Sequence, residues 1–202
     1  MKWEDFCANL MLTVGAAEGG KVHKNIIDDY NKISPLPRNY QVTIHDPWCA
    51  IYVSAMWHRY AEGWFPYECS CSKMVQLARN EGKFYSAAAT YGREGWLLFY
   101  DWERDGSPDH VGFIIDINAR NNQYRTLEGN YSDSVRERTI SMTDRRIYGL
   151  VQLEYSDNEV REAKEWVSRY DIMKGDGTID YWQNPPTREQ LAVILKRFYS
   201  AT

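Results

Sequence analysis

Residues 46–57 read DPWCAIYVSAMW, and this stretch predicts the central helix of the fold. Asp46 suits the N-cap position and Pro47 the first helical position, and the chain from there to Trp57 is mostly apolar. Cys49 would then lie in the first turn, where the helix dipole favours the thiolate, the reactive form of a cysteine. Because a free cysteine more often fills space in a core, a catalytic role also requires partner side chains.

A catalytic cysteine needs a general base within hydrogen-bond reach. The chain offers four histidines: His23, His45, His58 and His110. Because His58 lies nine residues after Cys49 on the same expected helix, it would point to the opposite face about 13 Å along the axis and is excluded. His110 opens a β-branched and aromatic segment that predicts a strand, and strands hold catalytic groups rigidly. His45 stays an alternative, and His23 lies in an expected loop.

The strand expected next along the chain ends in Glu128-Gly129-Asn130. Either Glu128 or Asn130 could hydrogen-bond the imidazole of His110 and fix its tautomer. Gly129 and Asn130 also suit a tight turn at a hairpin end, and the two interpretations are compatible.

Four short motifs, in this order and spacing, resemble the CHAP family of peptidoglycan amidases and endopeptidases. They are PWCAIYVS at 47–54, GWLLFYDW at 95–102, DHVG at 109–112 and TLEGN at 126–130. Each motif is weak alone, and their combination is specific over roughly residues 5 to 154. The resemblance implies a papain-like α+β fold that cleaves an amide bond in bacterial cell wall.

The resemblance also assigns roles to individual residues. It makes Cys49 the nucleophile and His110 the general base, with Glu128 and Asn130 as the third and fourth catalytic groups. The backbone N–H of Cys49, at the helix start, is a natural oxyanion donor. Some members of the family bind calcium through an acidic loop before the nucleophile, but residues 38–45 contain no clustered carboxylates. We therefore predict no calcium and no other cofactor.

The composition indicates one soluble domain with a real core, because 44% of the 202 residues are hydrophobic and 14% aromatic. The 24 basic and 28 acidic side chains give a net charge of −4 without a basic stripe, which argues against a nucleic-acid partner. Glu4 and Asp5 precede the apolar stretch 6–17, unlike the basic leader of a signal peptide, and no stretch reaches membrane-spanning length. By analogy we expect a phage endolysin, made in the host cytoplasm and released to the wall.

The cysteines show no metal-binding pattern. They are Cys7, Cys49, Cys69 and Cys71. No C-x-x-C pair and no histidine at ligand spacing accompanies them, so we predict no zinc site. Cys69 and Cys71 are too close in sequence for an easy mutual disulfide, and we expect free thiols.

Helices followed by strands predict an α+β domain spanning residues 1–154. The expected helices are 3–17, 25–32, 48–57 and 72–80, and the expected strands are 96–102, 110–117, 122–128, 134–140 and 146–154. The strands should form an antiparallel sheet. Among the tryptophans, which mostly fill cores, we expect Trp48 and Trp102 to face the cleft and bind substrate.

Residues 155–202 predict a helix, a Gly-rich turn and a second helix, each helix opening with a capping box. The segments 163–166, 172–177 and 186–192 resemble one S-layer homology motif, which implies contact between Arg188 and secondary cell-wall polysaccharide. Because a single helix pair builds little core, this segment either packs on the catalytic domain or associates with copies of itself in a homo-oligomer.

The leading hypothesis is a cysteine-dependent peptidoglycan hydrolase, either an N-acetylmuramoyl-L-alanine amidase or a stem or cross-bridge endopeptidase. The sequence does not choose between these bonds, because the choice depends on cleft shape. One alternative is a papain-like peptidase that acts on non-wall peptides or amide conjugates. Another is a catalytically silent wall-binding protein.

Overall fold

The computed structural model describes residues 2–87 and 91–155, together with residue 196. The chain divides between Tyr155 and Ser156 into two units, one residue beyond the boundary predicted from the sequence. The first unit is a mixed α and β structure with antiparallel sheets, in agreement with the α+β class. The predicted C-terminal helical hairpin and Arg188 lie outside the described residues.

The N-terminal half supplies the helices. They are α1 (Trp3–Met11), α2 (Lys21–Tyr30), a 3-10 turn η1 (Pro37–Asn39), α3 (Cys49–Tyr60) and α4 (Cys71–Asn80). All residues of α3 from Cys49 to Trp57 are buried, so this helix is the centre of the fold. Its composition, apolar all round with small residues, is that of a helix enclosed by other elements.

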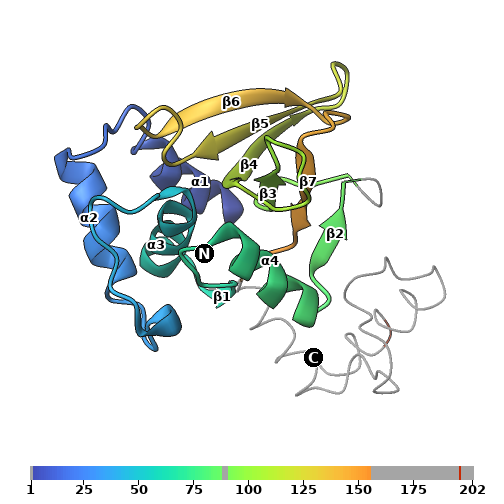
Figure 1. Ribbon diagram of the computed structural model, residues 1–202. Helices are drawn as coiled ribbons and strands as arrows, with labels where there is room; N and C mark the ends of the chain where they lie inside the picture. Colours follow the sequence, from blue (N-terminus) through green and yellow to red (C-terminus); the bar gives the residue numbers. More distant parts are fainter. Residues whose placement is uncertain (1, 88–90, 156–195, 197–202) are drawn as a thin grey trace. The chain divides into compact units, whose positions relative to one another are not determined.

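The strands follow, most of them in one sheet. They are β1 (Gly63–Trp64), β2 (Phe84–Ser86), β3 (Leu97–Tyr100), β4 (His110–Asn118), β5 (Gln123–Glu128), β6 (Arg136–Ser141), β7 (Ile147–Val151) and β8 (Glu154–Tyr155). Six of them form an antiparallel sheet in the order β2-β7-β3-β4-β5-β6, and β1 pairs with β8 separately. In Figure 1, α2 and α3 lie below β4, β5 and β6, and α3 contacts both β4 and β5.

The sheet is covered on both faces at β3. Leu97 and Phe99 belong to the core that contains α3, whereas Leu98 and Tyr100 belong to a second cluster with residues of β4, β5 and β7. All four side chains are fully buried. A strand buried on both faces has a continuous apolar sequence, and this explains the run LLFY.

The first helix is shorter than predicted, because it ends at Met11 rather than at residue 17. The chain beyond it pairs with the segment before β6. The N–H of Gly15 donates to the carbonyl of Val135, and the N–H of Val135 donates to the carbonyl of Ala16. This long-range pairing replaces two further helical turns and was not visible in the local pattern. The strand β2 was also missed.

Candidate active site

The helix α3 begins at Cys49, two residues after Pro47, which the sequence suited to the first helical position. The carboxylate of Asp46 does not cap the helix; it accepts hydrogen bonds from the N–H and the hydroxyl of Thr43 at 2.7 and 2.8 Å. Trp48 takes the N-cap position, and its carbonyl accepts the first helical hydrogen bond from the N–H of Tyr52. Cys49 is therefore the first helical residue, among the amides that have no partner inside the helix.

The Cys49 thiol is almost enclosed, with 6% of the residue exposed, and its surroundings favour the thiolate. The hydrogen bond with Cys71 lowers the pKa of Cys49 most, burial raises it, and the hydrogen bond and charge of His110 and the N–H of Ala50 lower it further. The resulting pKa lies well below that of an ordinary thiol. The surroundings of Cys49 at the helix start therefore favour the thiolate form.

His110 opens β4 and lies between Cys49 and Glu128. Its Nε2 is 2.9 Å from Oε2 of Glu128, which leaves Nδ1 for the thiol. Burial opposes a charge on the ring, but the hydrogen bonds and negative charges of Cys49 and Glu128 outweigh it and raise the pKa of His110 to about 9. The three side chains together are suited to hold a thiolate and an imidazolium.

Glu128 is fully buried at the end of β5, and every partner stabilises its charged form. Its carboxylate accepts hydrogen bonds from the Tyr100 hydroxyl at 2.6 Å, the Thr126 hydroxyl at 2.7 Å and Arg138 Nε at 2.9 and 3.0 Å. Burial raises the pKa of Glu128, but His110, Arg138 and Tyr100 lower it to about 2. A buried carboxylate without such partners would cost several kcal/mol.

The small size of Gly112 lets the carboxylate lie against β4. A Cβ atom at this position would stand 2.6 Å from Cγ of Glu128, closer than real contacts allow. Steric crowding by Glu128 thus explains why a glycine occupies the last position of the motif DHVG, and the sequence alone did not show this. It leaves Glu128 room to reach His110.

Asn130 lies in the turn after β5. Within the described residues no hydrogen bond joins it to His110, and its backbone has a φ of 58°. Asparagine tolerates this left-handed conformation better than most residues, so the turn explains its presence. Of the two orienting groups left open by the sequence, Glu128 makes the contact.

The other histidines have different environments. His23 lies in α2 rather than in a loop and is fully buried; its Nδ1 accepts the N–H of Gly19 at 2.9 Å. Its ring packs on Trp48, with 4.6 Å between the centroids, and burial lowers its pKa. His45 lies in the loop before α3, where its backbone N–H donates to the Thr43 hydroxyl, and within residues 2–87 and 91–155 no hydrogen bond joins its side chain to the site. His110 is the histidine whose pKa is raised by Cys49.

The two tryptophans expected in the cleft differ from each other. Trp48 is fully buried and its indole N–H donates to Glu18 at 2.9 Å, so the expectation that it faces the cleft was wrong. As the residue that begins α3, it packs into the core. Trp102 is partly exposed and follows β3, with its ring centroid 6.3 Å from that of His110. Its face carries the guanidinium of Arg138 at 4.7 Å.

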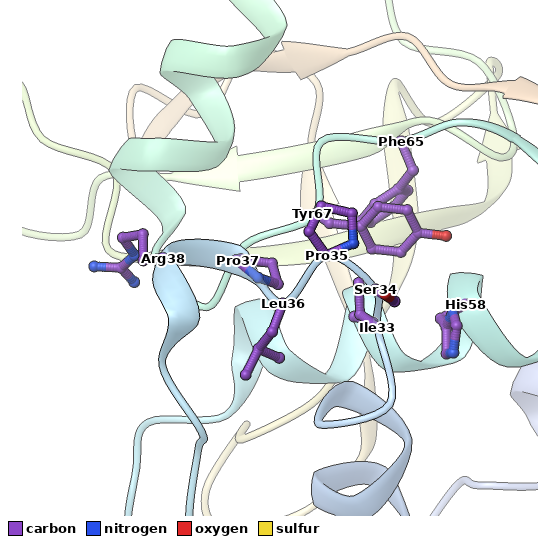
Figure 2. A pocket seen from close by; sticks show the side chains of 9 residues that line it. All are labelled: Ile33, Ser34, Pro35, Leu36, Pro37, Arg38, His58, Phe65 and Tyr67. Carbon is purple, nitrogen blue, oxygen red and sulfur yellow. The ribbon is translucent and has the colours of Figure 1, made fainter.

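A pocket in the structure lies at the other end of α3. Figure 2 shows it lined by residues 33–38 with His58, Phe65 and Tyr67. His58 follows Cys49 by nine residues, which separates them by about 13 Å along the helix. The pocket therefore belongs to a different surface from the reactive thiol.

Metal and membrane sites find no support in the part of the chain that the structure describes. Residues 2–87 and 91–155 contain no group of three or more His, Cys, Asp or Glu side chains that could hold a metal ion. No helix in the same ranges has the length and apolar character that a membrane crossing requires.

No protein-family model, no curated protein and no solved structure matches this chain. The resemblance to the CHAP family thus rests on the four motifs alone. What the site can do must be inferred from the chemistry of its own residues.

Several residues of the site were not identified from the sequence. Cys71 lies 22 positions from Cys49, and only the fold brings their sulfurs together. Arg138 lies on β6 directly opposite Thr126 of β5, a pairing that places its guanidinium beside Glu128. A buried carboxylate such as Glu128 needs a positively charged side chain as its partner, but the sequence does not identify which basic residue that is.

Proposed function

We propose that this protein is a cysteine-dependent amide hydrolase with a papain-like CHAP catalytic domain that cleaves peptidoglycan. The observation that carries the proposal is the 2.9 Å hydrogen bond between His110 Nε2 and Glu128 Oε2, together with the interaction through which His110 lowers the pKa of Cys49 and Cys49 raises the pKa of His110. A thiol at a helix start, a histidine at a strand start and a buried carboxylate behind it form the set that acyl transfer to sulfur requires.

The reaction begins when the thiolate of Cys49 attacks the amide carbon and the carbonyl electrons move to oxygen. The N–H of Cys49 donates to this oxyanion from the helix start. His110 then gives its proton to the leaving nitrogen as the C–N bond breaks, and a thioester remains on Cys49. Water, deprotonated by His110, attacks the thioester and releases the carboxylate and the thiolate.

Glu128 acts through the histidine. Its negative charge stabilises the imidazolium, and its bond to Nε2 fixes the orientation of the ring. Tyr100, Thr126 and Arg138 in turn keep Glu128 ionised and fixed. The carboxylate is thus a positioning group that does not exchange protons in the reaction.

The substrate class comes from the order of the CHAP-like motifs. Bacterial peptidoglycan offers amide bonds at the muramic acid lactyl group, in the stem and in the cross-bridge. Trp102 lies beside the catalytic histidine and is partly exposed, so we propose that it contacts the glycopeptide. The protein would act as a phage endolysin, made in the bacterial cytoplasm and acting at the wall after release.

The segment 155–202 would add wall affinity. We propose that Arg188 in the S-layer-homology-like motif contacts secondary cell-wall polysaccharide, with self-association of the segment as the alternative. Deletion of residues 156–202 retains Tyr155, which packs on Trp57 in the first unit. The truncated protein should bind purified walls less and keep its activity on soluble muropeptides, as measured by co-sedimentation and by chromatography.

The test is digestion of purified Gram-positive peptidoglycan by the wild type and by Cys49→Ala, followed by mass spectrometry of the new amine and carboxyl ends. Release by the wild type alone, at the lactyl–alanine amide or within the peptides, supports the proposal and identifies the bond. Cleavage of soluble peptides without cleavage of walls would replace it with a non-wall peptidase. Wall binding without any cleavage would replace it with a silent binder.

A further inference from the structure

A second thiol lies beside the reactive one. Sγ of Cys71 is 3.8 Å from Sγ of Cys49, and both residues are buried, with 7% and 6% of their surface exposed. Each cysteine is the first residue of a helix, Cys49 of α3 and Cys71 of α4. The two helix starts therefore hold two sulfurs in contact inside the site.

The hydrolytic reaction uses one thiol, so the second has no place in the mechanism above. The hydrogen bond with Cys49, burial and the charge of Cys49 all raise the pKa of Cys71, so a protonated Cys71 can donate to a Cys49 thiolate. A serine would donate the same bond. What a serine cannot do is form a covalent bond to the sulfur of Cys49.

The distance permits that bond after a small movement. A disulfide requires the sulfurs to close from 3.8 Å to about 2.05 Å. The two cysteines are 22 positions apart, so the chain between them does not prevent closure. Cys69, by contrast, lies beside Arg38, whose Nη2 is 2.8 Å from its sulfur.

We propose that Cys49 and Cys71 form a reversible disulfide when the protein meets a hydroperoxide, and that this bond stores the nucleophile in a protected, inactive form. The inactivation rests on the proposed hydrolase function, whereas formation of the bond does not. The site thus takes a hydroperoxide as a substrate in addition to the amide.

The chemistry balances in two steps. The Cys49 thiolate attacks one peroxide oxygen, the O–O bond breaks, and the released hydroxide takes up a proton to leave water and a sulfenic acid. The sulfur of Cys71, losing its proton, attacks the sulfenic sulfur of Cys49 and displaces a second water. Two thiols are oxidised by two electrons, and one hydrogen peroxide is reduced to two waters.

The disulfide would protect the nucleophile because it competes with further oxidation. A sulfenic acid without a neighbouring thiol continues to the sulfinic and sulfonic acids, which thiol reductants do not restore. With Cys71 in contact, ring closure within the site comes first. Peroxide exposure of the wild type should therefore be reversible at Cys49.

The test uses the full chain, reduced, desalted and treated with hydrogen peroxide. Trypsin would release Cys49 in peptide 39–59 and Cys71 in peptide 60–73, which also contains Cys69. The variant Cys69→Ser removes this ambiguity. We expect the two peptides to be linked in the wild type and in Cys69→Ser, with loss of two hydrogens from the protein, and to be separated by dithiothreitol.

The matched variant is Cys71→Ser, which keeps a hydrogen-bond donor beside Cys49 and cannot form the disulfide. Its peptide 39–59 should gain two or three oxygens that dithiothreitol does not remove. Oxygenated Cys49 with reduced Cys71 in the wild type, linkage to Cys7 or Cys69 instead, or no modification at all would overturn the proposal.

Wall digestion separates this inference from the proposed function. If the disulfide forms but the reduced protein releases nothing from walls, the redox site stands and the hydrolase proposal fails. If the reduced protein digests walls and peroxide produces no link, the hydrolase proposal stands and the disulfide proposal fails. If both hold, dithiothreitol should restore most activity to the oxidised wild type and little to oxidised Cys71→Ser.

Discussion

The two ends of α3 differ in how exposed their polar side chains are. At the N-terminal end, Cys49 is enclosed, and its neighbours His110 and Cys71 both favour its thiolate. At the C-terminal end, His58 is exposed and lies beside an open pocket, with its ring 6.2 Å from that of Tyr67. The difference shows that the pocket beside His58 and the surroundings that favour a thiolate at Cys49 lie at opposite ends of the helix. Reactivity follows charge pairing in an enclosed site.

The largest expected effect is at the enclosed end. Cys49→Ala removes the nucleophile and should lower wall digestion by at least about 10⁴-fold. The protein should stay folded, because alanine suits a helix start in the core. Circular dichroism and the rate of muropeptide release measure the two properties. Substantial release by a folded variant would mean that another group attacks the amide.

The next effect is a shift in pH dependence at Glu128. The wild-type rate should fall above pH 9, because His110, with its pKa of about 9, then loses the proton that the leaving amine needs. Glu128→Gln removes a negative charge that raises this pKa, so the alkaline fall should move to lower pH and the maximal rate should drop by about 10²-fold or more. An unmoved alkaline limb would show that Glu128 does not act on His110.

The same carboxylate should govern stability in acid. Its pKa is lowered to about 2 in the folded protein, so its contribution is present above the unfolded value and is lost as the pH falls toward 2. Arg138→Met removes one cause of this shift. We expect it to lose about 1–3 kcal/mol of unfolding free energy near neutral pH and less in acid, as measured by urea titration at several pH values. Equal losses at both pH values would point to packing alone.

The two tryptophans provide a smaller contrast near the same end. Trp102→Ala should raise the KM for muropeptides about tenfold with little change in melting temperature, because its ring is partly exposed beside His110. Trp48→Phe should instead lower stability by about 1–2 kcal/mol through loss of its bond to Glu18, with KM unchanged. A raised KM for Trp48→Phe and an unchanged KM for Trp102→Ala would show that the cleft lies on the other side of Cys49.

The smallest effect is expected at the open end. His58→Ala alters an exposed side chain and should change stability by no more than about 0.5 kcal/mol. Muropeptide release should stay within twofold of the wild type. Loss of turnover in a folded His58→Ala protein would transfer the chemistry to the pocket of Figure 2.

The sequence predicted the α+β class, the central helix and five of the six strands of the main sheet, because their apolar patterns are local. It also led to Cys49, His110 and Glu128, since each ends or begins an element at a recognisable motif. The sequence-based prediction failed where a long-range contact decides where a helix begins or ends. The pairing of Gly15 with Val135 shortens α1, and the bonds from Thr43 take Asp46 away from the helix start.

The same limit explains the misplaced and missing site residues. Trp48 stands next to the nucleophile in sequence, but as the N-cap of a buried helix it turns into the core. Cys71 and Arg138 reach the site from α4 and β6, which no short motif connects to Cys49. Local patterns identify the groups that react, and tertiary packing selects the groups that tune them.

The most direct test of the central claim is the pH dependence of Cys49 alkylation by iodoacetamide, followed peptide by peptide with mass spectrometry. Cys7 is the internal control, because burial and nearby carboxylates raise its pKa. We predict that Cys49 reaches its maximal alkylation rate well below pH 9, while Cys7 continues to accelerate above it. If Cys49 reacts no earlier in pH than Cys7, the enclosed end of α3 does not hold a thiolate and the account is wrong.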